Sequence, residues 1–226
     1  MIENCWLSSR CNRIDCDKEF CMKKFRTETL FDKALLSERH KEDVVMRLDA
    51  DLKDKENFEF LSSIQKNIDR FVAKGDSLYI MSPISGNGKT TWAIRLLKEY
   101  INKVWYKSDL ECKVLFIHVP KLLLELKERI RRPSEYADYI LENAGKADLV
   151  VFDEIATKVA TEYEHEHLLN LINTRVDAKK ASIYTSNVSN DEFLKNMGTR
   201  LYSRVISSSG DNIITLYGSD KRGMFE

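Results

Sequence analysis

One short segment, in which an apolar strand leads into a glycine-containing loop and then a helix, most strongly limits what this chain can fold into. The apolar stretch 78–82 is followed by Pro83-Ile84-Ser85-Gly86-Asn87-Gly88-Lys89-Thr90-Thr91, and a helix is expected over about 89–104. The loop matches the P-loop pattern G-x-x-x-x-G-K-[ST], except that Pro83 replaces the first glycine. Gly86 and Gly88 allow the backbone to curl so that its N–H groups face phosphate oxygens. We therefore expect a nucleotide-phosphate site at this loop.

The residues around the second glycine suit a triphosphate and its metal ion. Lys89 can reach the β- and γ-phosphates as a point charge, and the helix that begins near it presents the positive end of its dipole. The hydroxyl of Thr90 can bind Mg²⁺. An ordinary strand-to-helix turn is the alternative, but it does not account for the Gly-Lys-Thr-Thr sequence. The expected nucleotide contacts are Ser85, Gly86, Asn87, Gly88, Lys89, Thr90 and Thr91.

A second apolar strand, 149–152, ends in two acidic residues, Asp153 and Glu154. This is the Walker B arrangement, in which the first carboxylate holds Mg²⁺, usually through water. The second carboxylate can polarise an attacking water as a general base. The pair favours an enzyme that hydrolyses ATP over a kinase, which must exclude water. The alternative is two solvated acids at the end of a strand.

Polar and basic residues further along the chain extend this candidate site. The strand 182–185 ends in Thr185-Ser186-Asn187, and Asn187 is expected beside the Walker B strand, where an amide can orient water or contact the γ-phosphate. Ser-Asn also begins ordinary turns. Arg200 and Arg204 lie one helical turn apart, and an arginine from a neighbouring subunit can complete the charge around the γ-phosphate. A basic surface helix is the alternative.

The order of short apolar strands and helices predicts an α/β fold, with a parallel sheet covered by helices on both faces. The expected strands are 78–81, 114–117, 149–152, 182–185 and 213–216. The highly charged stretch 49–57 is the expected linker between an N-terminal part, 1–48, which carries a helix over 25–48, and an ATPase domain, 58–226.

Composition excludes two classes of protein. The chain has 36 basic and 36 acidic residues, so any nucleic-acid contact must come from a local patch rather than from bulk charge. Its apolar stretches are too short to span a bilayer. The N-terminus shows no basic region followed by an apolar run, which is the pattern of a signal peptide. We therefore expect a cytoplasmic protein with no membrane partner.

Four of the five cysteines, Cys5, Cys11, Cys16 and Cys21, lie close to the N-terminus. Clustered thiols in a reducing compartment are more often metal ligands than disulfides, and four thiolates match tetrahedral zinc. So short a segment cannot build its own core, and a metal ion would supply its folding energy. The spacing is looser than that of paired C-x-x-C sites. An iron–sulfur cluster and partly packed free thiols are the alternatives to Zn²⁺.

Together these motifs resemble the AAA+ ATPases of the DnaC/DnaI helicase-loader group, especially short phage or prophage-type versions. The resemblance covers about 1–24 and 56–226 and includes Asp220-Lys221-Arg222-Gly223 besides the motifs above. It implies a P-loop NTPase of AAA+ type with a five-stranded parallel sheet and a small N-terminal Cys-rich, zinc-type segment. The implied roles are ATP and Mg²⁺ binding for Lys89 and Thr90, Walker B for Asp153 and Glu154, sensor 1 for Asn187, arginine finger for Arg204 and sensor 2 for Arg222.

The same resemblance implies an ATP-dependent loader of a replicative hexameric DNA helicase. The N-terminal part would contact the helicase, the ATPase domain would bind single-stranded DNA, subunits would associate through the ATP site, and hydrolysis would release the helicase. Three alternatives remain open. They are a transposition helper ATPase of the IstB type, which typically lacks a cysteine cluster, a P-loop kinase for a small substrate, and a nucleotide-regulated binding module with negligible turnover.

A basic helix, expected over 121–132, is the candidate for DNA contact. It carries five basic residues against two acidic ones and could track a phosphate backbone within an assembled ring or spiral. The alternative is an amphipathic helix with its apolar face toward the core. The candidate DNA-binding residues are Lys127, Arg129, Arg131 and Arg132.

Overall fold

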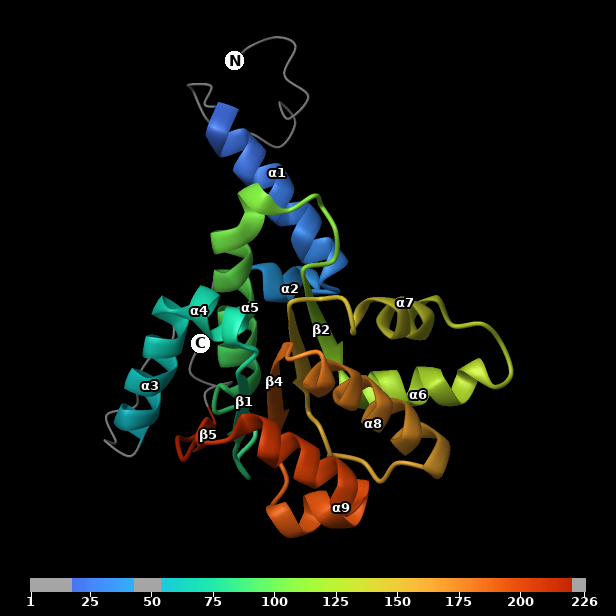
Figure 1. Cartoon of the computed structure of the whole chain (residues 1–226). Coiled ribbons are helices and arrows are strands. Elements are labelled where there is room, and N and C mark those ends of the chain that lie inside the picture. Colours follow the sequence, from blue (N-terminus) through green and yellow to red (C-terminus); the bar gives the residue numbers. More distant parts are fainter. Residues whose placement is uncertain (1–17, 43–53, 221–226) are drawn as a thin grey trace.

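The computed structural model describes residues 18–42 and 54–220, in which a parallel sheet is covered by helices (Figure 1). The strand order is β2-β3-β4-β1-β5, and every neighbouring pair is parallel. The α/β fold with a five-stranded parallel sheet, predicted from the sequence, is therefore confirmed. The strands are β1 (Ser77–Met81), β2 (Val114–His118), β3 (Leu149–Asp153), β4 (Ala181–Ser186) and β5 (Ile213–Thr215).

Helices lie on both faces of the sheet because successive strand residues point to opposite sides. In β1, Leu78 and Ile80 pack in one core and Tyr79 in the other. The first core joins the sheet to α1 (Lys18–Lys33), α3 (Lys55–Lys66), α4 (Ile68–Lys74) and α5 (Lys89–Val104). The second joins it to α6 (Val119–Arg129), α7 (Glu135–Asn143), α8 (Glu162–Asp177) and α9 (Asn190–Ser209). Burial on both faces explains why the strands are continuous apolar runs.

Several helix boundaries differ from those expected. The single helix predicted from residue 58 is two helices, α3 and α4, because Asn67 leaves helical geometry and its side chain donates to the carbonyl oxygen of Ser63 (3.0 Å). The short helix predicted over 190–197 continues to Ser209 through a kink at Gly198, where φ is +72° and ψ is 165°. The basic helix begins at Val119 and ends at Arg129, so Arg131 and Arg132 lie in the loop that follows it.

The helix predicted over 25–48 is also different, since α1 ends at Lys33 and a turn leads into the short α2 (Glu38–Lys41). Leu35 occupies the left-handed region in this turn, with φ at +60°. Leu30 and Ala34 are buried, and the backbone N–H of Phe116 in β2 donates to the carbonyl oxygen of Ala34 (2.8 Å). The segment 18–42 therefore packs against β2, an edge strand. The division into 1–48, 49–57 and 58–226 stays a prediction.

A buried arginine that the sequence analysis did not single out joins three elements at the amino-terminal end of the sheet. Arg175 of α8 is fully buried, and its Nε donates to Oγ of Ser182 in β4 (3.0 Å). Its terminal nitrogens donate to four backbone carbonyl oxygens. Burial lowers the pKa of Arg175 to about 10, so the guanidinium keeps its charge at neutral pH. The carbonyls belong to Ala144, Ala147, Asp148 and Ala181.

We expect Arg175→Met to lower the free energy of unfolding by about 3 kcal/mol, since it leaves buried carbonyl oxygens without a donor. Urea titration followed by circular dichroism measures the change. Arg70→Met on the exposed face of α4 is the matched control, with an expected change within about 0.5 kcal/mol. Equal unfolding free energies for the two variants would contradict this account.

Candidate functional site

Three neighbouring strands bring the predicted motifs to one edge of the sheet. β4 lies between β1 and β3, and Met81 pairs with Ser186 while Phe152 pairs with Tyr184. Because parallel strands end on the same side, the P-loop after β1, the Walker B acids at the end of β3 and Asn187 after β4 meet there. This edge is where ligands bind in open parallel sheets.

Thr90 and Asp153, the two residues predicted to share Mg²⁺, are in direct contact. The Thr90 hydroxyl donates to Oδ1 of Asp153 across 2.8 Å, although 63 residues separate them in the chain. Asp153 is only 4% exposed. A hydroxyl and a carboxylate are the hard oxygen ligands that Mg²⁺ prefers. The donor set therefore fits a magnesium ion held by Thr90 and Asp153.

Thr185, at the end of β4, supports the Walker B acids. Its hydroxyl donates to Oδ1 of Asp153 (2.8 Å) and accepts a hydrogen bond from the backbone N–H of Glu154 (2.9 Å). Its carbonyl oxygen accepts from the N–H of Ile155 (2.9 Å). Glu154 itself has φ at +57°, a left-handed conformation that is costly for a residue with a side chain. Thr185 therefore holds the turn in which Glu154 lies.

The P-loop has the curled backbone that its glycines predict, with φ at +74° for Gly86 and +104° for Gly88. Lys89 is 7% exposed, and its ammonium donates to the carbonyl oxygen of Ile84 (2.8 Å) inside the loop. The helix α5 begins at Lys89, so the first-turn N–H groups and the lysine charge face the same space.

His118 is a neighbour of the site that the sequence analysis left without a role. It ends β2, pairs in register with Asp153, and its Nδ1 lies 3.7 Å from Asp153 Oδ2. The nearby Asp153 carboxylate raises the pKa of His118 above its usual value. The signal available in the sequence was its position at the end of an apolar strand, which places it on the same edge as the Walker B acids.

The remaining predicted residues lie outside this cluster or at its margin. Asn187 Oδ1 accepts from the Thr157 hydroxyl (3.0 Å), so it joins the loop that follows Glu154. Arg200 and Arg204 are exposed on α9 and line a hollow of about 530 Å³ against α8. Arg222 lies outside the described residues.

The predicted zinc ligands are mostly outside the described part of the chain. Cys21 lies on α1, and Cys5, Cys11 and Cys16 precede residue 18. Within residues 18–42 and 54–220, no group of three or more His, Cys, Asp or Glu side chains is placed to hold a metal ion. In the same ranges, no helix has both the length and the apolar character to cross a membrane.

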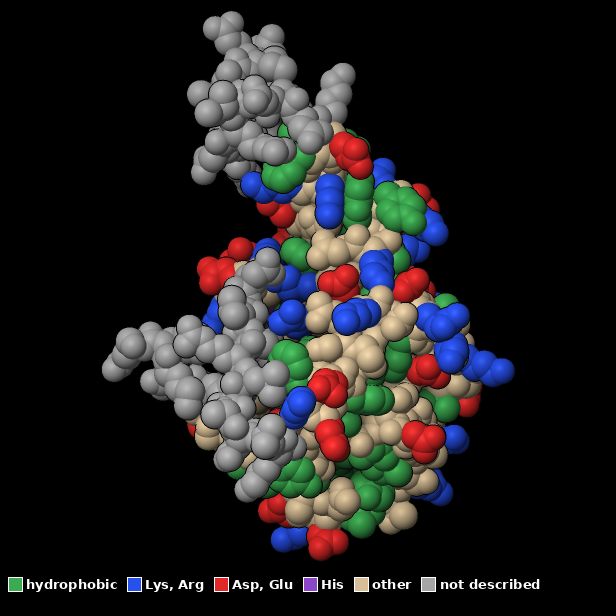
Figure 2. Space-filling model, turned by 90° about the vertical axis from the view of Figure 1, so that its left-hand side faces the viewer, with side chains coloured by type: hydrophobic (Ala, Val, Ile, Leu, Met, Phe, Trp, Pro, Cys, Tyr) green, Lys and Arg blue, Asp and Glu red, His purple; other side chains and the backbone are tan. Residues whose placement is uncertain are grey.

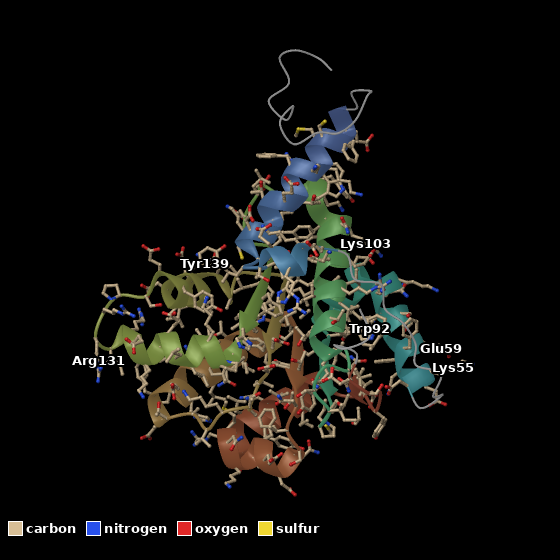
Figure 3. All side chains as sticks on the ribbon, turned by 180° about the vertical axis from the view of Figure 1, so that it is seen from behind. Lys55, Glu59, Trp92, Lys103, Arg131 and Tyr139 are labelled. Atoms are coloured by element: carbon tan, nitrogen blue, oxygen red, sulfur yellow. The ribbon has the colours of Figure 1, made fainter. Side chains whose placement is uncertain are left out.

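Two of the four predicted DNA-binding residues form ion pairs within the chain. Arg129 lies 2.7 Å from Asp138, and Arg132 lies 3.6 Å from Glu128. Figure 3 shows Arg131 at the tip of the molecule, on the opposite side from α3. On the face seen in Figure 2, basic and acidic side chains are interspersed. Arg129, Arg131 and Arg132 lie together at the α6–α7 loop, with Asp138 beside them.

Comparisons with known proteins agree with this geometry. No family model matches the chain. It is 25% identical over 127 residues to the replicative helicase loader DnaC of Escherichia coli K12, a match that covers 56% of this chain and 49% of the relative. The matched region thus spans about half the length of that curated relative.

Solved structures show the same fold. The crystal structure of the DnaC helicase loader superposes with a TM-score of 0.62 at 15% identity, covering 80% of this chain and 100% of that chain. The DnaI structure gives 0.58 at 17% identity, covering 80% and 94%. AMPPCP-bound DnaA from Aquifex aeolicus gives 0.54 at 15% identity, covering 78% and 49%. The resemblance expected from the motifs is therefore confirmed: the chain is similar in sequence to DnaC and shares its fold with DnaC, DnaI and DnaA.

Proposed function

We propose that this chain is an ATP-dependent loader of a replicative DNA helicase, acting in the cytoplasm. The observation that carries the proposal is the contact between Thr90 and Asp153, the two proposed Mg²⁺ ligands, on a fold shared with DnaC and DnaI. The sequence similarity to a protein named as a replicative helicase loader supports the choice of partner.

The residues at the sheet edge have separate tasks in hydrolysis. Lys89 and the P-loop N–H groups would hold the β- and γ-phosphates, and Thr90 and Asp153 would hold Mg²⁺, which would neutralise phosphate charge. Glu154 accepts a proton from the attacking water, whose oxygen bonds to the γ-phosphorus as the bond to the ADP oxygen breaks. Asn187 orients that water. The products are ADP and phosphate, and their formation changes the affinity for the helicase.

The N-terminal part is the proposed contact for the helicase. It comprises the four-cysteine segment, for which we propose Zn²⁺, and α1, whose Phe20, Met22 and Phe25 side chains are exposed. The helix packs beside the 3₁₀ turn η3 (Trp105–Lys107), which follows the carboxyl end of α5. The P-loop lies at the other end of α5, so helicase and nucleotide would bind at opposite ends of one helix.

The function is tested with Glu154→Gln, which keeps the side-chain shape but removes the base. We expect this variant to bind ATP and to hydrolyse it at least 100-fold more slowly. It should retain a hexameric helicase in a pull-down from host lysate with ATP, whereas the wild-type protein releases it. Recovery of a transposase instead would favour the IstB-type alternative, and unimpaired phosphate release would exclude Glu154 as the base.

Arg204 is the proposed arginine finger, presented to the ATP of a neighbouring subunit. It is exposed on α9, in the half of the helix that begins after the Gly198 kink. Nothing buries it against its own P-loop in the described residues, and an exposed position is what a contact in trans requires.

We expect Arg204→Ala to bind ATP within twofold of wild type but to lose at least 100-fold in turnover, because γ-phosphate charge is no longer neutralised. The measurement is the ATPase rate against protein concentration, since a contact in trans needs association. Arg200→Ala, which lines the same hollow, is the control and should lose less than threefold. Equal losses for both variants would count against a specific finger.

The loop after α6 is the proposed contact for single-stranded DNA. Arg129, Arg131 and Arg132 line a hollow of about 420 Å³ together with Asp138, which pairs with Arg129, and Tyr163, whose ring offers a stacking surface for a base. Arg132 is 75% exposed, and its ion pair with Glu128 is of the weak surface type, so a phosphate can replace the glutamate.

Reversal of charge at Arg131 and Arg132 to Glu should weaken binding of single-stranded DNA about tenfold and reduce its salt dependence, since each lost phosphate contact lowers the slope by about 0.7. Fluorescence anisotropy at several salt concentrations measures both quantities. Arg70→Glu, on the opposite side of the sheet, should change neither. An unaltered affinity in the double variant would place the DNA elsewhere.

A further inference from the structure

Residues 215–218, at the end of β5 and just after it, are held by side chains that lie far away in the sequence. The Asn57 side-chain amide donates to the carbonyl oxygen of Thr215 (2.8 Å). The Asp54 carboxylate accepts from the backbone N–H groups of Tyr217 (2.9 Å) and Gly218 (2.6 Å). Since Asp54 directly precedes α3 and Asn57 lies in its first turn, the start of this helix forms a seat for residues 215–218.

The same segment contacts the P-loop through the buried side chain of Asn87. Asn87 is 4% exposed, and its Nδ2 donates to the carbonyl oxygen of Leu216 (3.3 Å) and to Oγ of Ser82. Its Oδ1 faces the Lys89 ammonium (3.4 Å). A backbone carbonyl only accepts and an ammonium only donates. The amino group of Asn87 therefore faces Leu216, and its oxygen faces Lys89.

Asn87 therefore connects three parts of the site. Ser82 is the first residue after β1, Lys89 is the first residue of α5, and Leu216 follows β5. Ser82 is itself fixed, because its N–H donates to the carbonyl oxygen of Ser186 and its hydroxyl accepts from the N–H of Ile84. The amide of Asn87 thus closes the loop onto its own start and onto a neighbouring strand.

We propose that Asn87 is a positioning residue, which fixes the curl of the P-loop and the direction of Lys89 by anchoring both on the segment 215–218. The inference rests on the proposed ATP site. Asp54 and Asn57, which lie at the start of α3 and outside any phosphate-binding motif, then contribute to the affinity for nucleotide.

The physical basis is preorganisation. A loop that is already curled loses little conformational freedom when phosphate binds, whereas a loop that must be ordered by the ligand binds more weakly. The amino group of Asn87 is directed at Leu216 and Ser82, so its effect on nucleotide comes through loop geometry. The seat at Asp54 and Asn57 is linked to the loop through Leu216, whose carbonyl oxygen accepts from Asn87 and whose N–H donates to the carbonyl oxygen of Met81 at the end of β1.

The test is a double-mutant cycle on affinity for AMPPCP, measured by isothermal titration calorimetry. We expect Asn87→Ala to weaken binding about tenfold and Asn57→Ala about threefold, with the double variant no weaker than Asn87→Ala alone. In steady-state ATP hydrolysis, Asn57→Ala should raise KM about threefold with less than a twofold change in kcat. The fitted stoichiometry reports the folded fraction, which separates misfolding from a change in affinity.

Asn212→Ala is the matched control. Like Asn57, Asn212 donates from its side-chain amide to a backbone carbonyl oxygen, that of Ser77 (3.1 Å), but it lies at the opposite end of the sheet. The affinity of the Asn212→Ala variant for AMPPCP should stay within twofold of wild type. Additive effects of Asn87→Ala and Asn57→Ala, or an unchanged affinity in Asn87→Ala, would overturn the inference. A wild-type protein that binds no AMPPCP would instead overturn the proposed function.

Discussion

The parallel pairing of β1, β4 and β3 is the constraint on which the rest of the site depends. It sets the ends of three strands side by side, so that Thr90 reaches Asp153 across 2.8 Å and Thr185 reaches the same carboxylate oxygen across 2.8 Å. One oxygen of a nearly buried carboxylate thus receives two hydroxyl donors from two different elements. Such a convergence needs no loop to be long or mobile, because rigid strands and the first turn of α5 carry every group.

The helix α5 links this edge to the N-terminal part of the chain. It has 16 residues and so spans about 24 Å, from the P-loop to the turn that packs against α1. Midway, Lys98 donates to the carbonyl oxygens of Lys41 (2.8 Å) and Glu42 (3.0 Å), which places its charge at the carboxyl end of α2. A change in how Lys89 is held therefore has a direct structural path to α1 and α2, through one helix.

The two ends of the sheet use buried polar groups differently. At the amino-terminal end, the Arg175 guanidinium is satisfied by four carbonyl oxygens and a hydroxyl, and this arrangement only stabilises the fold. At the carboxyl end, Asp153, Lys89 and Asn87 are also buried. Asp153 and Lys89 are the groups proposed to hold Mg²⁺ and phosphate, whereas Asn87 is bonded to other parts of the chain.

Local patterns predicted the strands, the P-loop motif and the Walker B pair, because short apolar runs, paired glycines and adjacent acids have local physical causes. The start and end of α5 and the five strands followed from the same patterns to within a residue or two. Boundaries at Asn67 and Gly198 did not, since a single residue there leaves helical geometry inside an otherwise continuous apolar pattern.

The side chains that support the site become apparent only in the folded chain. Thr185, His118, Asn57 and Asp54 act on residues that lie between 31 and 164 positions away in the chain. Their roles depend on strand order and register, which place a polar side chain next to a partner that no spacing rule connects to it. The groups proposed to bind phosphate are therefore recognisable from local sequence. The groups that hold them in position depend on long-range packing.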